Sequence, residues 1–252
     1  MVRIPSNLSR RVSRFAAEVN PWAVRYECPI CGYQGPFRSV SPPSGRRRHA
    51  QCPSCNAMER HRLQYLVLES LLKELPVASM SILHFAPETF FQDYFSQRFG
   101  RYETADLFMT GVDHKVDLTN LPFEDESYDM VFASHVLEHI HDDRKALREI
   151  RRILPPGGVA VLPVPLVAER TIEYPEPNPH EADHVRAPGY ADYFDRYRAI
   201  FSRVDLSASD SFPERYQLYV YEDRTDYPTP TIPWRTPMRG HRHVDIVPVC
   251  YR

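Results

Sequence analysis

Glycine is scarce in this chain, and features that mark several specialised protein classes are missing. Only 9 of the 252 residues are glycine, whereas 24 are proline, the reverse of the usual balance of about 7% and 5%. No apolar run approaches the roughly 20 residues of a transmembrane helix, and 5 cysteines in this length are too few for a disulfide scaffold. These absences exclude a transmembrane span and a disulfide-rich domain, and favour a globular chain with a sizeable core.

The start of the chain also lacks a secretory signal, because Met1 to Asn20 holds no apolar segment before a cleavage-like site. Its arginines and serines are typical both of organellar transit peptides and of basic leaders that pack on a domain or stay partly disordered. We expect a cytoplasmic protein with a basic leader at residues 1–24. Eleven Arg and three Glu give residues 1–62 a formal charge of +8, so the rest carries −10 of the net −2.

Two cysteine pairs form the strongest local pattern. Cys28 and Cys31 enclose Pro-Ile, Cys52 and Cys55 enclose Pro-Ser, and 20 residues separate the pairs, as in a four-cysteine zinc ribbon. Four thiolates complete the tetrahedron that zinc prefers and leave no open coordination position. Two disulfides or redox pairs are the alternative, which the duplicated turn disfavours. We predict a ribbon at residues 25–57 with a structural Zn²⁺.

Three consecutive arginines, Arg46 to Arg48, lie between the two cysteine pairs. On a ribbon hairpin they predict an exposed basic tip that can contact phosphates, although a solvated loop also explains such a run. RNA is therefore one candidate partner. The charge of −10 on the remaining residues argues against a long nucleic-acid footprint.

After the ribbon, apolar residues recur with helical and strand periods in turn. A linking helix is predicted at residues 58–78, and short apolar runs then alternate with helical stretches. Around the predicted helix Asp142 to Leu154 this alternation forms a clear βαβ unit. Strands interleaved with helices predict an α/β, doubly wound Rossmann-like sheet with helices on both faces.

Four motifs follow one another in a fixed order: Asp117-Leu-Thr-Asn-Leu-Pro-Phe, Ser127-Tyr-Asp-Met-Val-Phe, His135-Val-Leu-Glu-His-Ile and Leu154-Pro-Pro-Gly-Gly. In this order the sequence resembles class I S-adenosylmethionine-dependent methyltransferases, most of all the small-molecule type 11 group. The cysteine pairs together with Leu83-His-Phe-Ala-Pro-Glu resemble bacterial zinc-ribbon methyltransferases with an "LHFAPE" first motif. The resemblance implies a seven-stranded sheet within residues 79–222 and S-adenosyl-L-methionine as cofactor.

The same resemblance implies which residues bind this cofactor. The family's first loop reads Asp-x-Gly-x-Gly, but here His84, Ala86 and Glu88 stand in place of the acid and the two glycines. Glu88 is expected to pair with the cationic methionine end, and Asp106 to accept hydrogen bonds from the ribose hydroxyls. The full expected set is His84, Phe85, Ala86, Glu88, Asp106, Asp117, Leu118, Ser134 and His135.

Methyl transfer requires alignment of the acceptor in a water-poor site, with a base only if the acceptor must lose a proton. Residues 165–189 are predicted to form a proline-interrupted lid over an acceptor, which we expect to be a small polar metabolite, natural product or sugar. In it His184 is the first candidate for general base, and Asp183 or Arg186 for orienting the acceptor. A salt-bridged loop without chemistry is the alternative.

A second group of candidates follows the fourth strand. His135, Glu138 and His139 would share one face if this segment were helical, and His135 is a further catalytic candidate. Some relatives hold a divalent metal with a similar motif here. The alternative is a buried polar cluster that braces the loop.

The end of the chain is predicted to complete the sheet and then to leave it. By the family pattern the last two strands are Phe201 to Ser207 and Tyr216 to Glu222. Residues 223–252 form a proline-rich tail that cannot be a central strand, and Trp234 indicates that it packs over the site or on a partner in a homodimer.

Two other functions remain open. One is an rRNA or tRNA methyltransferase that grips RNA with the ribbon and Arg46 to Arg48. The other is a non-catalytic binding protein that keeps the fold, which the intact Asp106 and Asp117 disfavour.

Overall fold

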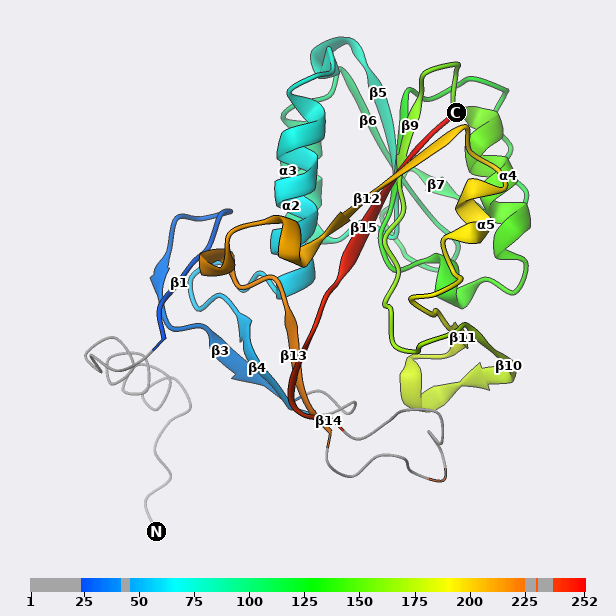
Figure 1. Ribbon diagram of the computed structural model, residues 1–252. Coiled ribbons are helices and arrows are strands. Elements are labelled where there is room, and N and C mark those ends of the chain that lie inside the picture. Colours follow the sequence, from blue (N-terminus) through cyan, green and yellow to red (C-terminus); the bar gives the residue numbers. More distant parts are fainter. Residues whose placement is uncertain (1–23, 42–45, 225–229, 231–237) are drawn as a thin grey trace.

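A seven-stranded sheet forms the centre of the molecule (Figure 1), and the computed structural model describes residues 24–41, 46–224, 230 and 238–252. The strand order is β12-β15-β9-β8-β5-β6-β7. Strands β5 to β9 run parallel, whereas β15 is antiparallel to both neighbours. The predicted doubly wound α/β sheet is thereby confirmed. Its strands are β5 (Ser81–Phe85), β6 (Arg101–Asp106), β7 (His114–Lys115), β8 (Met130–Ala133), β9 (Val159–Val161), β12 (Arg203–Ala208) and β15 (Ile246–Tyr251).

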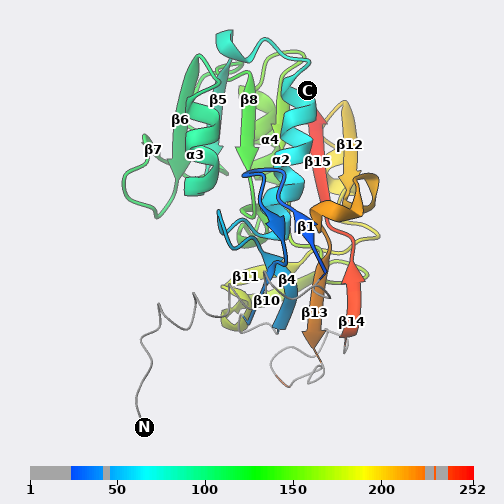
Figure 2. The same cartoon turned by 90° about the vertical axis from the view of Figure 1, so that its left-hand side faces the viewer.

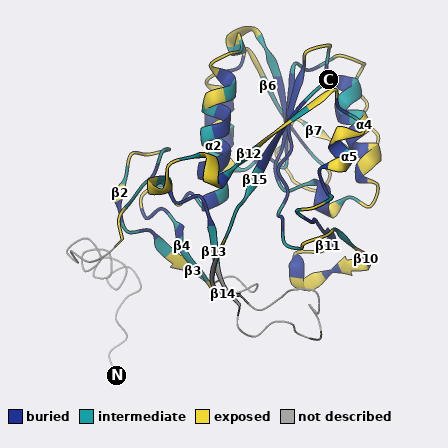
Figure 3. Ribbon diagram, in the orientation of Figure 1, coloured by how far each residue is buried: buried dark blue, intermediate teal, exposed yellow. Residues whose placement is uncertain are grey.

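Helices cover both faces of this sheet because its strands are apolar on both sides. Ile82 and Phe132 pack with α2 and α3 on one face, and Leu83 and Val131 pack with α4 and the segment around α5 on the other. Figure 3 shows the buried strands between the two helical layers. No helix in the described part of the chain is long and apolar enough to cross a bilayer. The helices are α2 (Glu59–Leu72), α3 (Thr89–Ser96), α4 (Asp143–Ile153) and α5 (Asp195–Arg198).

The prediction for the last strand of the sheet is wrong. Tyr216 to Glu222 does not join the central sheet, and β15, from the predicted tail, lies between β12 and β9 instead. Residues 209–245 are therefore an insertion between the last two strands of the sheet. The predicted leader, apart from Val24, and Trp234 lie outside the described residues.

Pro248 is tolerated in β15 because the carbonyl of its neighbour Leu162 accepts a hydrogen bond from another side chain. The Leu162 amide donates to the Pro248 carbonyl at 3.3 Å, but proline has no N–H to return the bond. The Tyr197 hydroxyl donates to the Leu162 carbonyl instead, at 2.9 Å. A proline at this position therefore leaves no buried acceptor without a partner.

A smaller sheet joins the N-terminal segment to the insertion. Its order is β14-β13-β4-β3, so β4 pairs with strands on both sides. The expected exposed tip is therefore wrong for Arg47 and Arg48, which are half-buried in an interior strand, whereas Arg46 at the start of β4 is exposed. Figure 2 shows β13 and β14 beside β4. These strands and the separate β1-β2 pair are β1 (Tyr26–Glu27), β2 (Gln34–Gly35), β3 (Arg38–Val40), β4 (Arg46–Gln51), β13 (Val220–Arg224) and β14 (Met238–His243).

The predicted lid is a hairpin with an irregular register. Its strands β10 (Ile172–Asn178) and β11 (His184–Ala187) pair antiparallel, and in Figure 1 they lie at the same lower end of the central sheet as the smaller sheet. Short 3₁₀ turns complete the fold: η1 (Val77–Ser79), η2 (Leu137–His139), η3 (Pro179–Glu181), η4 (Ser209–Ser211) and η5 (Glu214–Tyr216).

Arg62, on α2, ties the N-terminal segment to the insertion. Its guanidinium is fully buried and donates to the carbonyls of Ala50 and Ala57, at 3.0 and 2.8 Å. On its other side it donates to the carbonyls of Tyr216 and Gln217, at 3.0 and 2.6 Å. One side chain thus satisfies buried acceptors from segments more than 150 residues apart.

Replacing Arg62 with Met should lower the free energy of unfolding by about 3 kcal/mol, because the change leaves several buried carbonyls without a donor. Urea unfolding of zinc-loaded protein measures this loss. Arg198→Met is the matched control, because the Arg198 side chain is 53% exposed and its removal should cost less than about 0.5 kcal/mol. Equal losses in the two variants would contradict the role of Arg62.

Candidate functional site

The four predicted zinc ligands lie together. The sulfurs of Cys28 and Cys55 are 3.6 Å apart and those of Cys31 and Cys52 are 3.7 Å apart, and all four lie within 4.8 Å of one another. Tetrahedral zinc with bonds of about 2.3 Å places its sulfurs roughly 3.8 Å apart. The cluster therefore fits Zn²⁺ and, with four thiolates, a structural site.

Both cysteine turns reach this geometry in the same way. Gly32 follows the first pair with φ of 71°, and Asn56 follows the second with φ of 63°. Glycine and asparagine are the residues that adopt this left-handed conformation most readily. The sequence thus places one suitable residue directly after each pair.

A cavity of ≈430 Å³ lies where β5, β6 and β8 end. This is the carboxyl edge of the sheet, where ligands of open α/β folds bind, and the volume suits a cofactor-sized molecule. Six residues from the predicted cofactor set line it: Phe85, Ala86, Asp106, Asp117, Leu118 and His135. Asp183, predicted for the acceptor, lines it as well.

Left-handed residues other than glycine gather around this cavity. Ala86 has φ of 46° and His135 has φ of 56°, while Ala182 and Asp183, from the lid, have φ of 55° and 60°. Each such residue costs of order 1 kcal/mol, and such strain is concentrated at functional sites. The missing glycine of the first loop is therefore replaced by an alanine held in the conformation that glycine would adopt.

Two carboxylates in the cavity are held by neighbouring amides. Asp106 Oδ1 accepts from the amides of Phe108 and Met109 at 2.6 and 2.7 Å, and Asp117 Oδ1 accepts from the Thr119 amide at 2.8 Å. Within the described residues, the second oxygen of each carboxylate has no hydrogen-bond partner. Both side chains therefore have a fixed orientation and one acceptor left for a ligand.

Two predicted cofactor residues lie away from the cavity. His84 is fully buried, its Nδ1 lies 3.1 Å from the Tyr102 hydroxyl, and burial lowers the pKa of His84 to about 3. Ser134 is buried as well and exchanges hydrogen bonds with Gln64 of α2. Both side chains belong to the core between the sheet and its helices.

Glu88, also absent from the lining, is held by the start of α2. Its Oε1 accepts from Arg60 at 2.6 Å and from His61 Nε2 at 3.0 Å. Burial alone would raise the pKa of Glu88, but the His61 hydrogen bond and the Arg60 charge lower it to about 2. Its second oxygen, Oε2, is buried and has no hydrogen-bond partner in the part of the chain that the structure describes.

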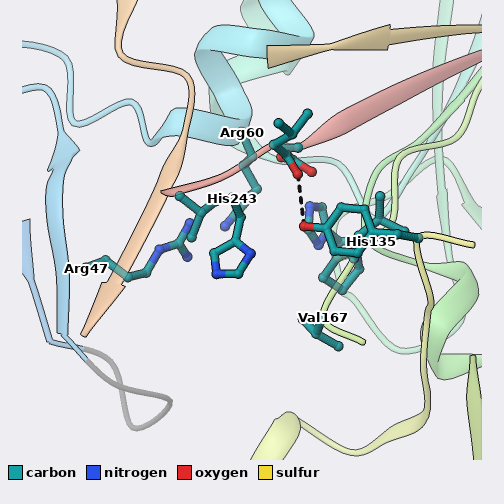
Figure 4. Close-up of a pocket in the computed structure, with 11 residues that line it drawn as sticks. Arg47, Arg60, His135, Val167 and His243 are labelled. Carbon is teal, nitrogen blue, oxygen red and sulfur yellow. Dashed lines mark hydrogen bonds between the residues drawn. The ribbon is translucent and has the colours of Figure 1, made fainter. Parts of the chain in front are cut away.

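A second cavity adjoins the first at His135, which lines both. Figure 4 shows Arg47, Arg60 and His243 around it, with His135 and Val167 at the opposite side. The Tyr190 hydroxyl, also in the lining, donates to the Val244 carbonyl at 2.9 Å. The full lining is Arg47, Arg60, His135, Pro165, Leu166, Val167, Tyr190, Val220, His243, Val244 and Asp245. The smaller sheet, the lid and the insertion thus build this cavity together.

The remaining predicted catalytic residues, His184 and Arg186, line neither cavity. Arg186 is buried and donates to the carbonyls of Leu137, Ile140 and His141 at 2.6 to 2.8 Å. It therefore fixes the loop after β8 against the lid. His184 lies 4.0 Å from the Glu138 carboxylate.

Sequence reasoning missed several residues of the second cavity, Asp245 and His243 above all. They lie in the segment that we predicted to be a tail outside the sheet. The signal that could have found them is the apolar run after Asp245, Ile-Val-Pro-Val-Cys-Tyr, whose length suits a strand and places Asp245 at its start.

Comparison with known proteins agrees with this geometry. Residues 97–162 match the family described as "Methyltransferase domain". They run from the end of α3 through β9 and include Asp106, Asp117 and His135. The match covers less than half of the chain.

Curated relatives match over short segments. The chain is 43% identical over 60 residues to an uncharacterized 37.1 kDa protein in transposon TN4556 of Streptomyces fradiae, covering 24% of this chain. It is 46% identical over 57 residues to the demethylmenaquinone methyltransferase of Clavibacter sepedonicus, covering 20% of this chain. The chain spans 17% and 23% of the lengths of these two relatives.

Among solved structures, an S-adenosylmethionine-dependent methyltransferase from Mesorhizobium loti superposes with a TM-score of 0.50 at 16% sequence identity. The superposition covers 75% of this chain and 98% of that one. At this identity the likeness shows a shared fold, in agreement with the strand order described above.

Replacing Cys52 with Ser should remove one of four thiolates and lower the bound zinc from one equivalent per chain to well below half an equivalent, because structural sites need all four ligands. Elemental analysis after dialysis measures the zinc. Cys250→Ser is the control, since Cys250 lies in β15 away from the cluster and should leave one equivalent. An unchanged zinc content in Cys52→Ser would contradict the assignment.

Proposed function

We propose that this protein transfers a methyl group from S-adenosyl-L-methionine to a small polar acceptor. The observation that supports this most directly is the cavity at the carboxyl edge of the sheet, with the oriented carboxylates of Asp106 and Asp117. The matched methyltransferase domain, whose residues include both of these, supports the same activity.

The residues present fit this cofactor. Asp106 has one free oxygen for the ribose hydroxyls, Asp117 has one for the adenine amino group, and the buried Leu118 offers an apolar surface to the ring. The cofactor supplies a methyl carbon activated by its sulfonium, so the chain's main task is to align the acceptor.

We assign the second cavity to the acceptor because it meets the cofactor cavity at His135. Leu166, Val167 and Val220 give it apolar walls, and Arg47, Arg60 and Asp245 give it polar groups that can orient a hydroxyl or an amine. The smaller sheet and the insertion enclose it, which favours a small molecule. RNA is disfavoured because Arg47 is paired with the buried Glu59 at 2.8 Å.

For proton removal we favour His135 over His184, because only His135 lines both cavities. Asp245 is a second candidate on the acceptor side, since burial raises the pKa of its carboxyl and thereby makes it a stronger base. His184 faces Glu138 instead and is better suited to positioning. Separately, we propose that the protein forms a homodimer through its C-terminal segment.

Replacing Asp106 with Ala should weaken binding of S-adenosylmethionine about 10-fold or more, because the ribose hydroxyls lose a charged acceptor. Isothermal titration calorimetry measures the affinity of zinc-loaded protein. Asp205→Ala, on an exposed position of β12, is the control and should bind as the wild type does. No binding to the wild-type protein would contradict the proposed function.

His135→Ala should lower turnover about 100-fold or more while a matched His141→Ala, at an exposed position of the same loop, leaves it unchanged. Release of S-adenosylhomocysteine with a panel of hydroxylated and amino metabolites measures turnover. Near-normal turnover of His135→Ala, with Asp245→Asn inactive, would instead assign the base to Asp245.

A further inference from the structure

Glu138, in the turn η2, is a buried carboxylate whose partners in the described part of the chain are two histidines, which are charged only when protonated. Its side chain is 0% exposed, and both Oε1 and Oε2 lack a hydrogen-bond partner among the described residues. A carboxylate removed from water without compensation costs several kcal/mol. Such a group indicates that a cation normally lies against it.

Three histidines surround this carboxylate. His184 Nε2 lies 4.0 Å from Glu138 Oε1 and His135 Nδ1 lies 3.4 Å from it. The rings of His139 and His184 meet edge to face, with centroids 4.7 Å apart.

The donor atoms of Glu138, His139 and His184 fit one ion. They all lie within 4.8 Å of one another. Bonds of about 2.1 Å place neighbouring donors roughly 3.0 to 3.4 Å apart in octahedral or tetrahedral geometry, so these side chains would move closer together when an ion binds. His184 approaches Glu138 from strand β11 of the lid. The segment 135–139 therefore supplies only two of the three ligands in this set.

We propose that Glu138, His139 and His184 form a second metal site for a divalent transition-metal ion, with His135 beside it. Two imidazoles and one carboxylate suit Mn²⁺, Fe²⁺, Co²⁺, Ni²⁺ or Zn²⁺, whereas the four thiolates of the ribbon select zinc. The two sites differ in chemistry and are filled independently.

The ion would lie beside the cofactor cavity. His139 is exposed and lines the cofactor cavity together with Asp183 and His135. Three protein ligands leave open coordination positions, as in catalytic sites. An acceptor hydroxyl bound there would be oriented and acidified. This role rests on the proposed methyl transfer, whereas metal binding does not.

The test is a titration of zinc-loaded full-length protein with Co²⁺, followed by visible absorption and calorimetry. We expect one equivalent to bind with weak d–d bands typical of nitrogen and oxygen ligands, and no sulfur-to-cobalt charge-transfer band. His139→Ala and His184→Ala should each weaken Co²⁺ binding at least 10-fold, and Glu138→Gln should abolish it. His139 is exposed, so its removal tests the site without disturbing the core.

His180→Ala is the matched control, because His180 is an exposed histidine of the same lid and should leave the affinity unchanged. No Co²⁺ binding beyond the ribbon site, or binding that survives all three ligand substitutions, would overturn the proposal; Glu138 would then be an ion-pair partner of a protonated histidine. Cofactor binding, measured in the same samples, separates this outcome from failure of the proposed methyl transfer.

Discussion

The buried guanidinium of Arg62 is the interaction on which the rest of this architecture depends. It bonds carbonyls of the ribbon and of the insertion at once, and both parts contribute residues to the second cavity. A lysine could not replace it, because one ammonium cannot reach acceptors on two sides of a planar fork. Without these two parts, the second cavity would lose the walls formed by Arg47, Val220 and Asp245.

Two loops of the site hold strained backbone in place of glycine. Ala86 and His135 both have positive φ, and they lie one residue after β5 and two residues after β8, parallel strands whose pairing fixes these positions. The rigid sheet therefore stabilises conformations that these residues rarely adopt in isolation. At His135 the strain has a clear result, because it directs one imidazole to the boundary between the two cavities.

Much of the fold could be predicted because its signals are local. The strand and helix periods of residues 80 to 164 and the spacing of Cys28 to Cys55 each lie within one stretch of sequence. The errors come from partners distant in sequence. Pro248 is tolerated in β15 only because Tyr197 satisfies Leu162, and Arg47 and Arg48 are interior because β13 pairs with them. Likewise, the approach of His184 to Glu138 depends on the lid fold, which no spacing rule encodes.

The position of β15 also constrains how the chain folds. This strand follows all others in sequence, yet it bridges β12 and β9 in the middle of one half of the sheet. During synthesis, β9 must therefore expose an unpaired edge until residues 246–251 emerge. In the same way, β4 keeps one unpaired edge until β13 emerges. A nascent chain that stalls before these segments presents two open edges, so both sheets close late and almost together.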